Sequence, residues 1–90
     1  IAQFPRYAMV KEKLDFLSRE IPGALRRVKQ HFSHEVQDTT DGLKILWPDR
    51  WLLVRASSSE SAIRVIAEAS TSQMAQSLSQ QAMECLRPSL

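Results

Sequence analysis

The chain has 90 residues, with 12 Lys and Arg against 10 Asp and Glu, a net charge of +2 and an isoelectric point near 9.0. Its 43% hydrophobic and 24% charged residues are ordinary for one soluble globular domain with a modest core. The basic residues are scattered, which argues against a nucleic-acid-binding stripe, and no apolar run has the length of a membrane span. A single cysteine excludes an internal disulfide and fits a reducing, cytoplasmic compartment.

The first part of the chain predicts an extended entry, a strand and a helix. Residues 1–6 contain Pro5 and little periodic pattern, so we expect a linker there and a folded domain over residues 7–90. Residues 7–16 alternate imperfectly, which predicts a strand. Pro22 suits the first turn of the helix that follows. Its apolar face would consist of Ile21, Leu25, Val28 and Phe32.

The second part predicts short strands and a final helix. The polar residues 35–40 favour a short strand, and a tight hairpin at residues 48–50 would join strands at 43–47 and 51–55. A strand at 63–69 precedes a helix that is capped by Ser70 or Thr71 and ended by Pro88. The inward stripe of that helix would be Met74, Leu78, Ala82, Cys85 and Leu86. The order strand–helix–strand–strand–strand–helix predicts an α+β domain with a four-stranded antiparallel sheet and both helices on one face.

The strongest functional signal is the stretch from Arg55 to Arg64, in which two arginines bracket four hydroxyls and one carboxylate between apolar segments. Arginine supplies planar bidentate donors and serine supplies neutral donors, so this composition fits a phosphate site. The expected phosphate ligands are Arg55, Ser57, Ser58, Ser59 and Arg64. The alternative is a polar surface hairpin whose serines satisfy its own turn.

Other residues are weaker candidates for a functional site. A carboxylate at Glu60 would repel an anion, so we expect it to support the loop by pairing with a guanidinium or capping backbone N–H groups. His31 and His34 have no second Cys/His pair to complete a zinc site, so no metal ligand is predicted. Cys85 lies on an apolar stripe, as a core thiol does.

No catalytic residue is predicted either, because Ser57 and Ser59 have no base nearby in the sequence. Trp47 and Trp51 could stack on a sugar or a base, although packing of the sheet against its helices is the simpler interpretation. The Arg26-Arg27 pair could form a binding patch, but a solvated helix face is favoured.

The stretch from Arg55 to Arg64 resembles the R-P-S-G-T-E-P-x-x-R signature of the alpha-D-phosphohexomutase superfamily. Both arginines match in type and register, as do Ser57 and Glu60, and Ser59 keeps the hydroxyl of the family threonine. Three positions depart from the signature, namely Ala56, Ser58 and Ser61 in place of Pro, Gly and Pro. Three further segments resemble family motifs: Phe4-Pro5-Arg6-Tyr7, Asp41-Gly42-Leu43-Lys44-Ile45 and Arg64-Val65-Ile66-Ala67-Glu68-Ala69. The resemblance covers nearly the whole chain, but only the C-terminal domain of a larger enzyme.

The resemblance implies a TATA-binding-protein-like fold and a parent enzyme that moves a phosphoryl group between the 1- and 6-positions of a hexose phosphate through a bisphosphate. It also implies a phosphoserine and a Mg²⁺ loop in other domains, so this segment alone would be inert. Arg55, Ser57, Ser59 and the backbone near Ser58 would hold the non-reacting phosphate, while Arg64 either joins them or braces Glu60.

The implied partners are the hexose phosphate and the remaining domains of the mutase, hinged at residues 4–7, without nucleic acid or membrane. A free-standing small α/β binding module for RNA or a protein partner stays open as the alternative. Its support is the slight basicity, the Arg26-Arg27 pair and the two tryptophans.

Overall fold

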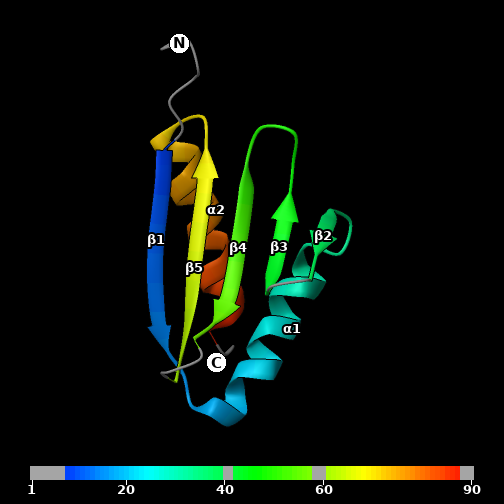
Figure 1. Ribbon diagram of the computed structural model, residues 1–90, viewed down its shortest axis with the longest axis vertical. Helices are drawn as coiled ribbons and strands as arrows, with labels where there is room; N and C mark the ends of the chain where they lie inside the picture. Colours follow the sequence, from blue (N-terminus) through cyan, green and yellow to red (C-terminus); the bar gives the residue numbers. More distant parts are fainter. Residues whose placement is uncertain (1–7, 40–41, 58–60, 88–90) are drawn as a thin grey trace.

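The computed structural model describes residues 8–39, 42–57 and 61–87. Over these residues the chain forms a five-stranded antiparallel sheet in the order β1-β5-β4-β3-β2 (Figure 1). The elements are β1 (Ala8–Asp15), a short 3-10 helix η1 (Ser18–Glu20), α1 (Ile21–His31), β2 (Val36–Asp38), β3 (Leu43–Leu46), β4 (Trp51–Ala56), β5 (Ala62–Ala69) and α2 (Ser72–Leu86).

The predicted α+β class is confirmed, and so is the short strand expected within residues 35–40, which is β2; the four-stranded sheet was wrong, because β2 joins it at the edge as a fifth strand. This strand pairs only with β3 and has just three residues, of which Gln37 faces the helices. The Gln37 amide donates to the carbonyls of Lys29 and Phe32 at 3.0 and 2.8 Å. The sequence predicted this strand but not its contact with α1, in which the Gln37 side chain satisfies carbonyls at the end of the helix.

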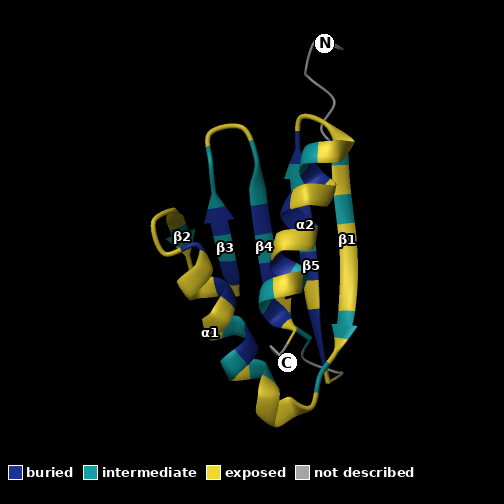
Figure 2. Cartoon of the chain, turned by 180° about the vertical axis from the view of Figure 1, so that it is seen from behind, coloured by how far each residue is buried: buried dark blue, intermediate teal, exposed yellow. Residues whose placement is uncertain are grey.

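Both helices cover the same face of the sheet, as predicted (Figure 2). Alternate strand residues point to opposite faces, so Leu52 and Val54 are fully buried under the helices whereas Leu53 is only half-buried on the other side. In β5, Ile63, Val65, Ala67 and Ala69 are likewise fully buried. Val28 and Phe32 of the predicted α1 stripe lie in the core, together with Ala24, which the pattern analysis omitted.

Helix α2 begins and ends on recognisable contacts. Thr71 has an extended backbone, and its hydroxyl accepts a hydrogen bond from the Met74 amide at 3.1 Å, which confirms one of the two predicted caps. At the other end, the Arg27 guanidinium from α1 donates to the carbonyl oxygens of Cys85, at 2.9 Å, and Leu86. A cation at a helix C-terminus also complements the helix dipole. Arg27 therefore joins the two helices. Pro88, the predicted end of α2, lies outside the described residues.

Candidate functional site: a row of cations on the uncovered sheet face

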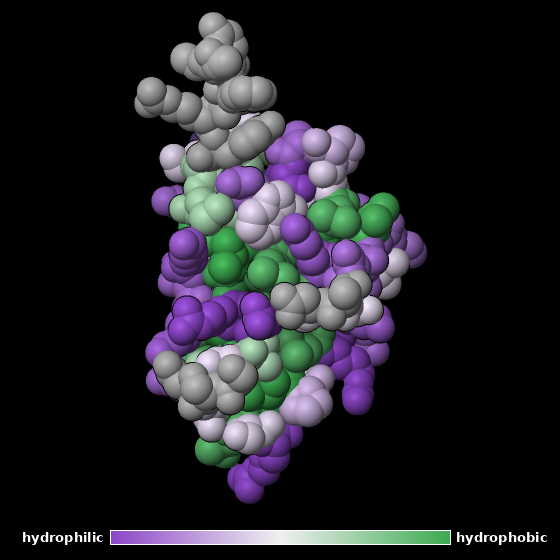
Figure 3. Space-filling view, viewed as in Figure 1, coloured by the Kyte–Doolittle hydropathy of each residue, from purple (hydrophilic) through white to green (hydrophobic). Residues whose placement is uncertain are grey.

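The two arginines of the predicted phosphate site lie opposite each other in the sheet. Arg55 is the penultimate residue of β4 and pairs in register with Arg64 of β5. Both side chains are exposed and lie on the face without helices, because Val54 and Val65 beside them are buried on the covered face. Figure 3 shows this face, where a hydrophilic band crosses the sheet between hydrophobic areas. The register thus brings the two cations together at the strand ends that flank the hydroxyl-rich connection.

The ends of this connection are anchored to the fold. The Ser57 amide donates to the Ala62 carbonyl at 2.9 Å and closes the hairpin. On the other side, the Ser61 carbonyl accepts from the Phe16 amide at 2.9 Å, and its hydroxyl lies 3.1 Å from that of Ser18. Because the Ser57 amide is already used, the hydroxyl is the donor that Ser57 can offer to a ligand. Ser58, Ser59 and Glu60 lie outside the described residues, and their roles stay predictions.

Gly42 is a site residue that sequence reasoning missed. It has a φ of 92°, and a Cβ added there would lie 3.2 Å from both the Arg55 Cβ and the Val54 carbonyl oxygen. Only glycine adopts this conformation readily, and only glycine leaves room for the base of the Arg55 side chain. The Asp41-Gly42 pair was visible in the sequence as a turn signal, and Asp41 lies outside the described residues. What the sequence did not reveal is that the glycine supports Arg55.

The two tryptophans are accounted for by contacts within the domain. Trp47 packs edge-on against Phe32 with ring centroids 5.7 Å apart, and the Arg50 guanidinium lies 4.9 Å from the Trp47 ring centroid. The Trp51 indole N–H donates to a Glu68 carboxylate oxygen at 2.8 Å. The Lys44 ammonium lies 4.8 Å from the Trp51 ring centroid. The predicted packing against the helices therefore accounts for Trp47, whereas Trp51 lies on the uncovered face and contacts Glu68 and Lys44 there.

The Arg26-Arg27 pair does not act as a unit. Arg27 is engaged with the α2 carbonyls, whereas Arg26 is exposed on α1. Both arginines are exposed, as the favoured interpretation of a solvated helix face expects, and Arg27 in addition donates hydrogen bonds to the end of α2. A binding patch formed by both arginines is therefore not supported, because Arg27 donates its hydrogen bonds to α2.

Metal binding and thiol chemistry find no support among the described residues. Within them, no group of three or more His, Cys, Asp or Glu side chains could hold a metal ion. Helix α1 ends at His31, so His34 does not share a helical face with it, as expected. Burial raises the pKa of the Cys85 thiol, Glu84 raises it further and Arg27 lowers it in part. A raised pKa leaves less thiolate, which fits a core thiol rather than a nucleophile. No helix in the described part of the chain is long and apolar enough to span a membrane.

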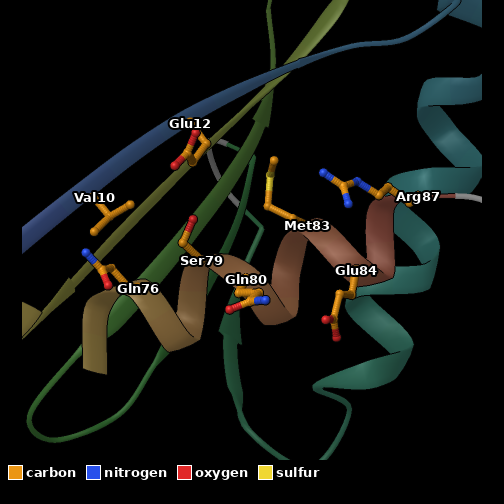
Figure 4. Close-up of a pocket in the computed structure, with 8 residues that line it drawn as sticks. All are labelled: Val10, Glu12, Gln76, Ser79, Gln80, Met83, Glu84 and Arg87. Carbon is orange, nitrogen blue, oxygen red and sulfur yellow. The ribbon is translucent and has the colours of Figure 1, made fainter. Parts of the chain in front are cut away.

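A groove of about 400 Å³ lies between β1 and α2 (Figure 4). Glu12 from β1 and Glu84 from α2 line it, together with Met83 and Arg87. It lies on the helix-covered side of the sheet, away from Arg55 and Arg64. Two carboxylates in a groove would repel a phosphate, so this feature does not compete with the cation site as an anion site.

Comparison with known proteins identifies the family of the chain. Residues 7–84 match the family model described as "Phosphoglucomutase/phosphomannomutase, C-terminal domain". The chain belongs to this family. This confirms the resemblance found in the sequence, and the matched region spans every helix and strand up to the last turn of α2.

The relatives that match this chain are much longer proteins than the matched domain. A probable phosphoglucosamine mutase of Pyrococcus abyssi is 28% identical over 92 aligned residues, which cover 98% of this chain and 20% of that protein. A phosphoglucomutase/phosphomannomutase of Thermococcus kodakarensis is 34% identical, with 83% of this chain and 17% of that protein covered. A phosphoglucosamine/phosphogalactosamine mutase of Sulfurisphaera tokodaii is 36% identical, with 84% and 17% covered. The chain therefore spans about a fifth of the length of these curated relatives.

Proposed function

We propose that this C-terminal domain anchors the phosphate of a hexose phosphate within a larger phosphohexomutase. The parent enzyme would interconvert hexose 1-phosphate and hexose 6-phosphate through a bisphosphate, and this domain would hold whichever phosphate is not reacting. The domain by itself would be catalytically inert, because its contribution is binding and orientation.

The observation that carries the proposal is the pairing of Arg55 with Arg64 on the uncovered face. Like charges directly opposite each other across two strands destabilise a sheet, by roughly 0.2–1 kcal/mol on the scale of such cross-strand pairs. Local conflicts of this kind are concentrated at functional sites. A dianionic phosphate placed between the two guanidinium groups would be attracted by both.

Each part of the site would contribute a different kind of contact. Arg55, held against Gly42, would present its planar fork to two phosphate oxygens, and Arg64 would approach from the neighbouring strand. The Ser57 hydroxyl would donate from the start of the connection, with Ser58 and Ser59 following it in sequence. Glu60 would support the arginines rather than touch the anion. Fixing one phosphate in this way would orient the far end of the sugar for a reaction in another domain.

The Mg²⁺ implied for the parent enzyme does not fit the described part of this chain. No group of three or more potential ligands there could hold the ion. In the complete enzyme the ion would stabilise the charge of the transferred phosphoryl group, held by residues of another domain. The domain described here would act on the opposite end of the substrate.

The proposal is tested by titrating the ¹⁵N-labelled 90-residue chain with glucose 6-phosphate at low ionic strength. We expect shifts at the Arg55 side chain and over residues 57–64, with an affinity near the millimolar range because an open site leaves the contacts competing with water. Glucose without phosphate should produce none of these shifts. Arg55→Gln should weaken binding about tenfold or more, since a charge-assisted hydrogen bond contributes about 1.5–3 kcal/mol. Arg26→Gln, which removes an exposed arginine of α1, is the matched control and should leave the affinity unchanged.

The alternative, a free-standing module for RNA or a protein partner, predicts a different pattern. RNA oligomers would then shift resonances of α1 around Arg26, and the sugar phosphate would shift nothing near Arg55. That result would overturn the proposed function. The engagement of Arg27 and both tryptophans in contacts within the domain already weakens this alternative.

A further inference from the structure

We infer that Lys13 is a third cation of the phosphate site and extends it across three strands of the uncovered face. This inference rests on the proposed function, because it concerns the same anion. We use the term cation row for Lys13, Arg64 and Arg55 in that spatial order.

The strand register places Lys13 in the row. Lys13 of β1 pairs with Arg64 of β5, which in turn pairs with Arg55 of β4. All three side chains are exposed, and neighbouring strands lie about 4.8 Å apart, so Arg64 has a cation on each side. Lys13 shares their face because its neighbour Leu14 pairs with the buried Ile63 and faces the helices. Lys13 is more than 40 positions from either arginine in the chain, yet the register brings the three cations into one row, with the exposed carboxylate of Asp15 two residues further along β1 on the same face.

The next row of the same face shows that this clustering is not a general property of the sheet. Two residues along each strand, Lys11 pairs with Ile66, and Ile66 pairs with Leu53. Leu53 pairs in turn with Lys44, so two apolar residues separate the two lysines. Like charges lie side by side only in the row that adjoins the hydroxyl-rich connection, among the rows the structure describes. An anion with two charges placed there would be attracted by all three cations.

Lys13 would contribute charge rather than geometry. An ammonium group on a flexible four-carbon stem acts as a compact point charge, whereas a guanidinium imposes a planar fork. Lys13 can therefore reach the outer side of a phosphate that Arg55 and Arg64 orient. Its effect should depend on the positive charge alone, so arginine should replace it and glutamine should not.

The test compares Lys13→Gln with Lys11→Gln in the titration with glucose 6-phosphate. Lys11 lies on the same strand and the same face, is equally classed as exposed and carries the same charge, but it pairs with Ile66 instead of Arg64. We expect Lys13→Gln to weaken binding about fivefold, the upper range for a solvent-exposed charge contact, and Lys11→Gln to change it less than about twofold. Lys13→Arg should restore the wild-type affinity. Added salt should shrink the difference between the two glutamine variants, because exposed charges are screened.

The outcomes separate this inference from the proposed function. Equal weakening by Lys13→Gln and Lys11→Gln, with the wild type still binding, would show only a general charge effect and would overturn the role of Lys13 while the phosphate site stands. Absence of binding to the wild-type chain would overturn the proposed function, and the inference with it. A ¹⁵N spectrum of each variant shows whether the fold is retained, and Lys13→Arg gives a second variant in which the charge is kept.

Discussion

The two ends of the sheet treat their charged side chains in opposite ways. At the β3–β4 hairpin, Arg50 pairs with Asp49 at 2.9 Å and lies over Trp47, while Glu68 accepts from Trp51. At the β4–β5 end, the register sets Arg55, Arg64 and Lys13 side by side. Both ends are rich in arginine and aromatic or hydroxyl groups, so composition alone does not separate them.

The difference concerns which charges lie next to each other at each end. The hairpin end places opposite or complementary groups together, and its contacts hold the turn. At the other end, like charges lie side by side on the uncovered face, and the proposed anion site rests on this arrangement. The following changes should affect one end without affecting the other.

The largest effect is expected for Gly42→Ala at the cation end. A side chain at φ 92° is strained, and the added Cβ would meet Arg55 and the Val54 carbonyl at 3.2 Å. Strain of this kind costs on the order of 2 kcal/mol, which lowers the melting temperature by about 10 °C in a domain of this size. Displacement of Arg55 should also weaken hexose phosphate binding. Thermal unfolding and the titration measure the two effects.

Gly23→Ala is the control for this substitution. A Cβ at Gly23 in α1 would meet only the Arg27 side chain, at 3.9 Å, so alanine should stabilise the helix by about 0.5–1 kcal/mol. If Gly42→Ala proved as stable as the wild type, the close approach to Arg55 would not be what requires glycine there.

Binding at the cation end should weaken as the pH falls, because the ligand gains a proton. A phosphate monoester has a second pKa of about 6, so its dianion dominates at pH 7 and is scarce near pH 5. We expect the affinity to fall by up to about tenfold over that range, since a monoanion offsets less of the row's charge. Neither histidine lies on the sheet face, as His31 ends α1 and His34 follows it. Titrations at the two pH values measure the change, and an affinity that rose on acidification would contradict the anion site.

A smaller effect is expected at the hairpin end for Trp51→Phe. The substitution removes the indole N–H that donates to Glu68 at 2.8 Å and should cost about 1 kcal/mol of folding free energy. The affinity for hexose phosphate should stay unchanged. Chemical denaturation gives the stability, and Glu68→Gln, which keeps an acceptor oxygen, should be milder. If Trp51→Phe weakened phosphate binding, the two ends of the sheet would not be independent, and the contrast drawn between them would be wrong.

The smallest effect is expected for Arg50→Gln. Its ion pair with Asp49 is exposed, with 30% and 54% of the two side chains accessible, so solvent screening limits it to less than about 0.5 kcal/mol. Binding of hexose phosphate should be unaffected, in contrast to Arg55→Gln. The same titration and unfolding measurements check both statements.

Local patterns in the sequence were enough to place most elements and their faces. Alternation in residues 51–55 and 63–69 separates the two faces of each strand, and a helical period placed Val28 and Phe32 on one apolar face, which the structure buries. These predictions succeeded because a side chain's face depends only on the period of its own element. The family was likewise visible in the stretch from Arg55 to Arg64, since a motif is a property of contiguous residues.

The neighbours of those residues were decided by the tertiary structure. Lys13 lies beside Arg64, Gly42 against Arg55, and Arg27 on the last carbonyls of α2 because of how distant segments pair and pack. The contact of Gln37 in β2 with the end of α1 was decided in the same way. A chain encodes its local periods residue by residue, but strand register and helix docking follow from burying all the apolar faces at once.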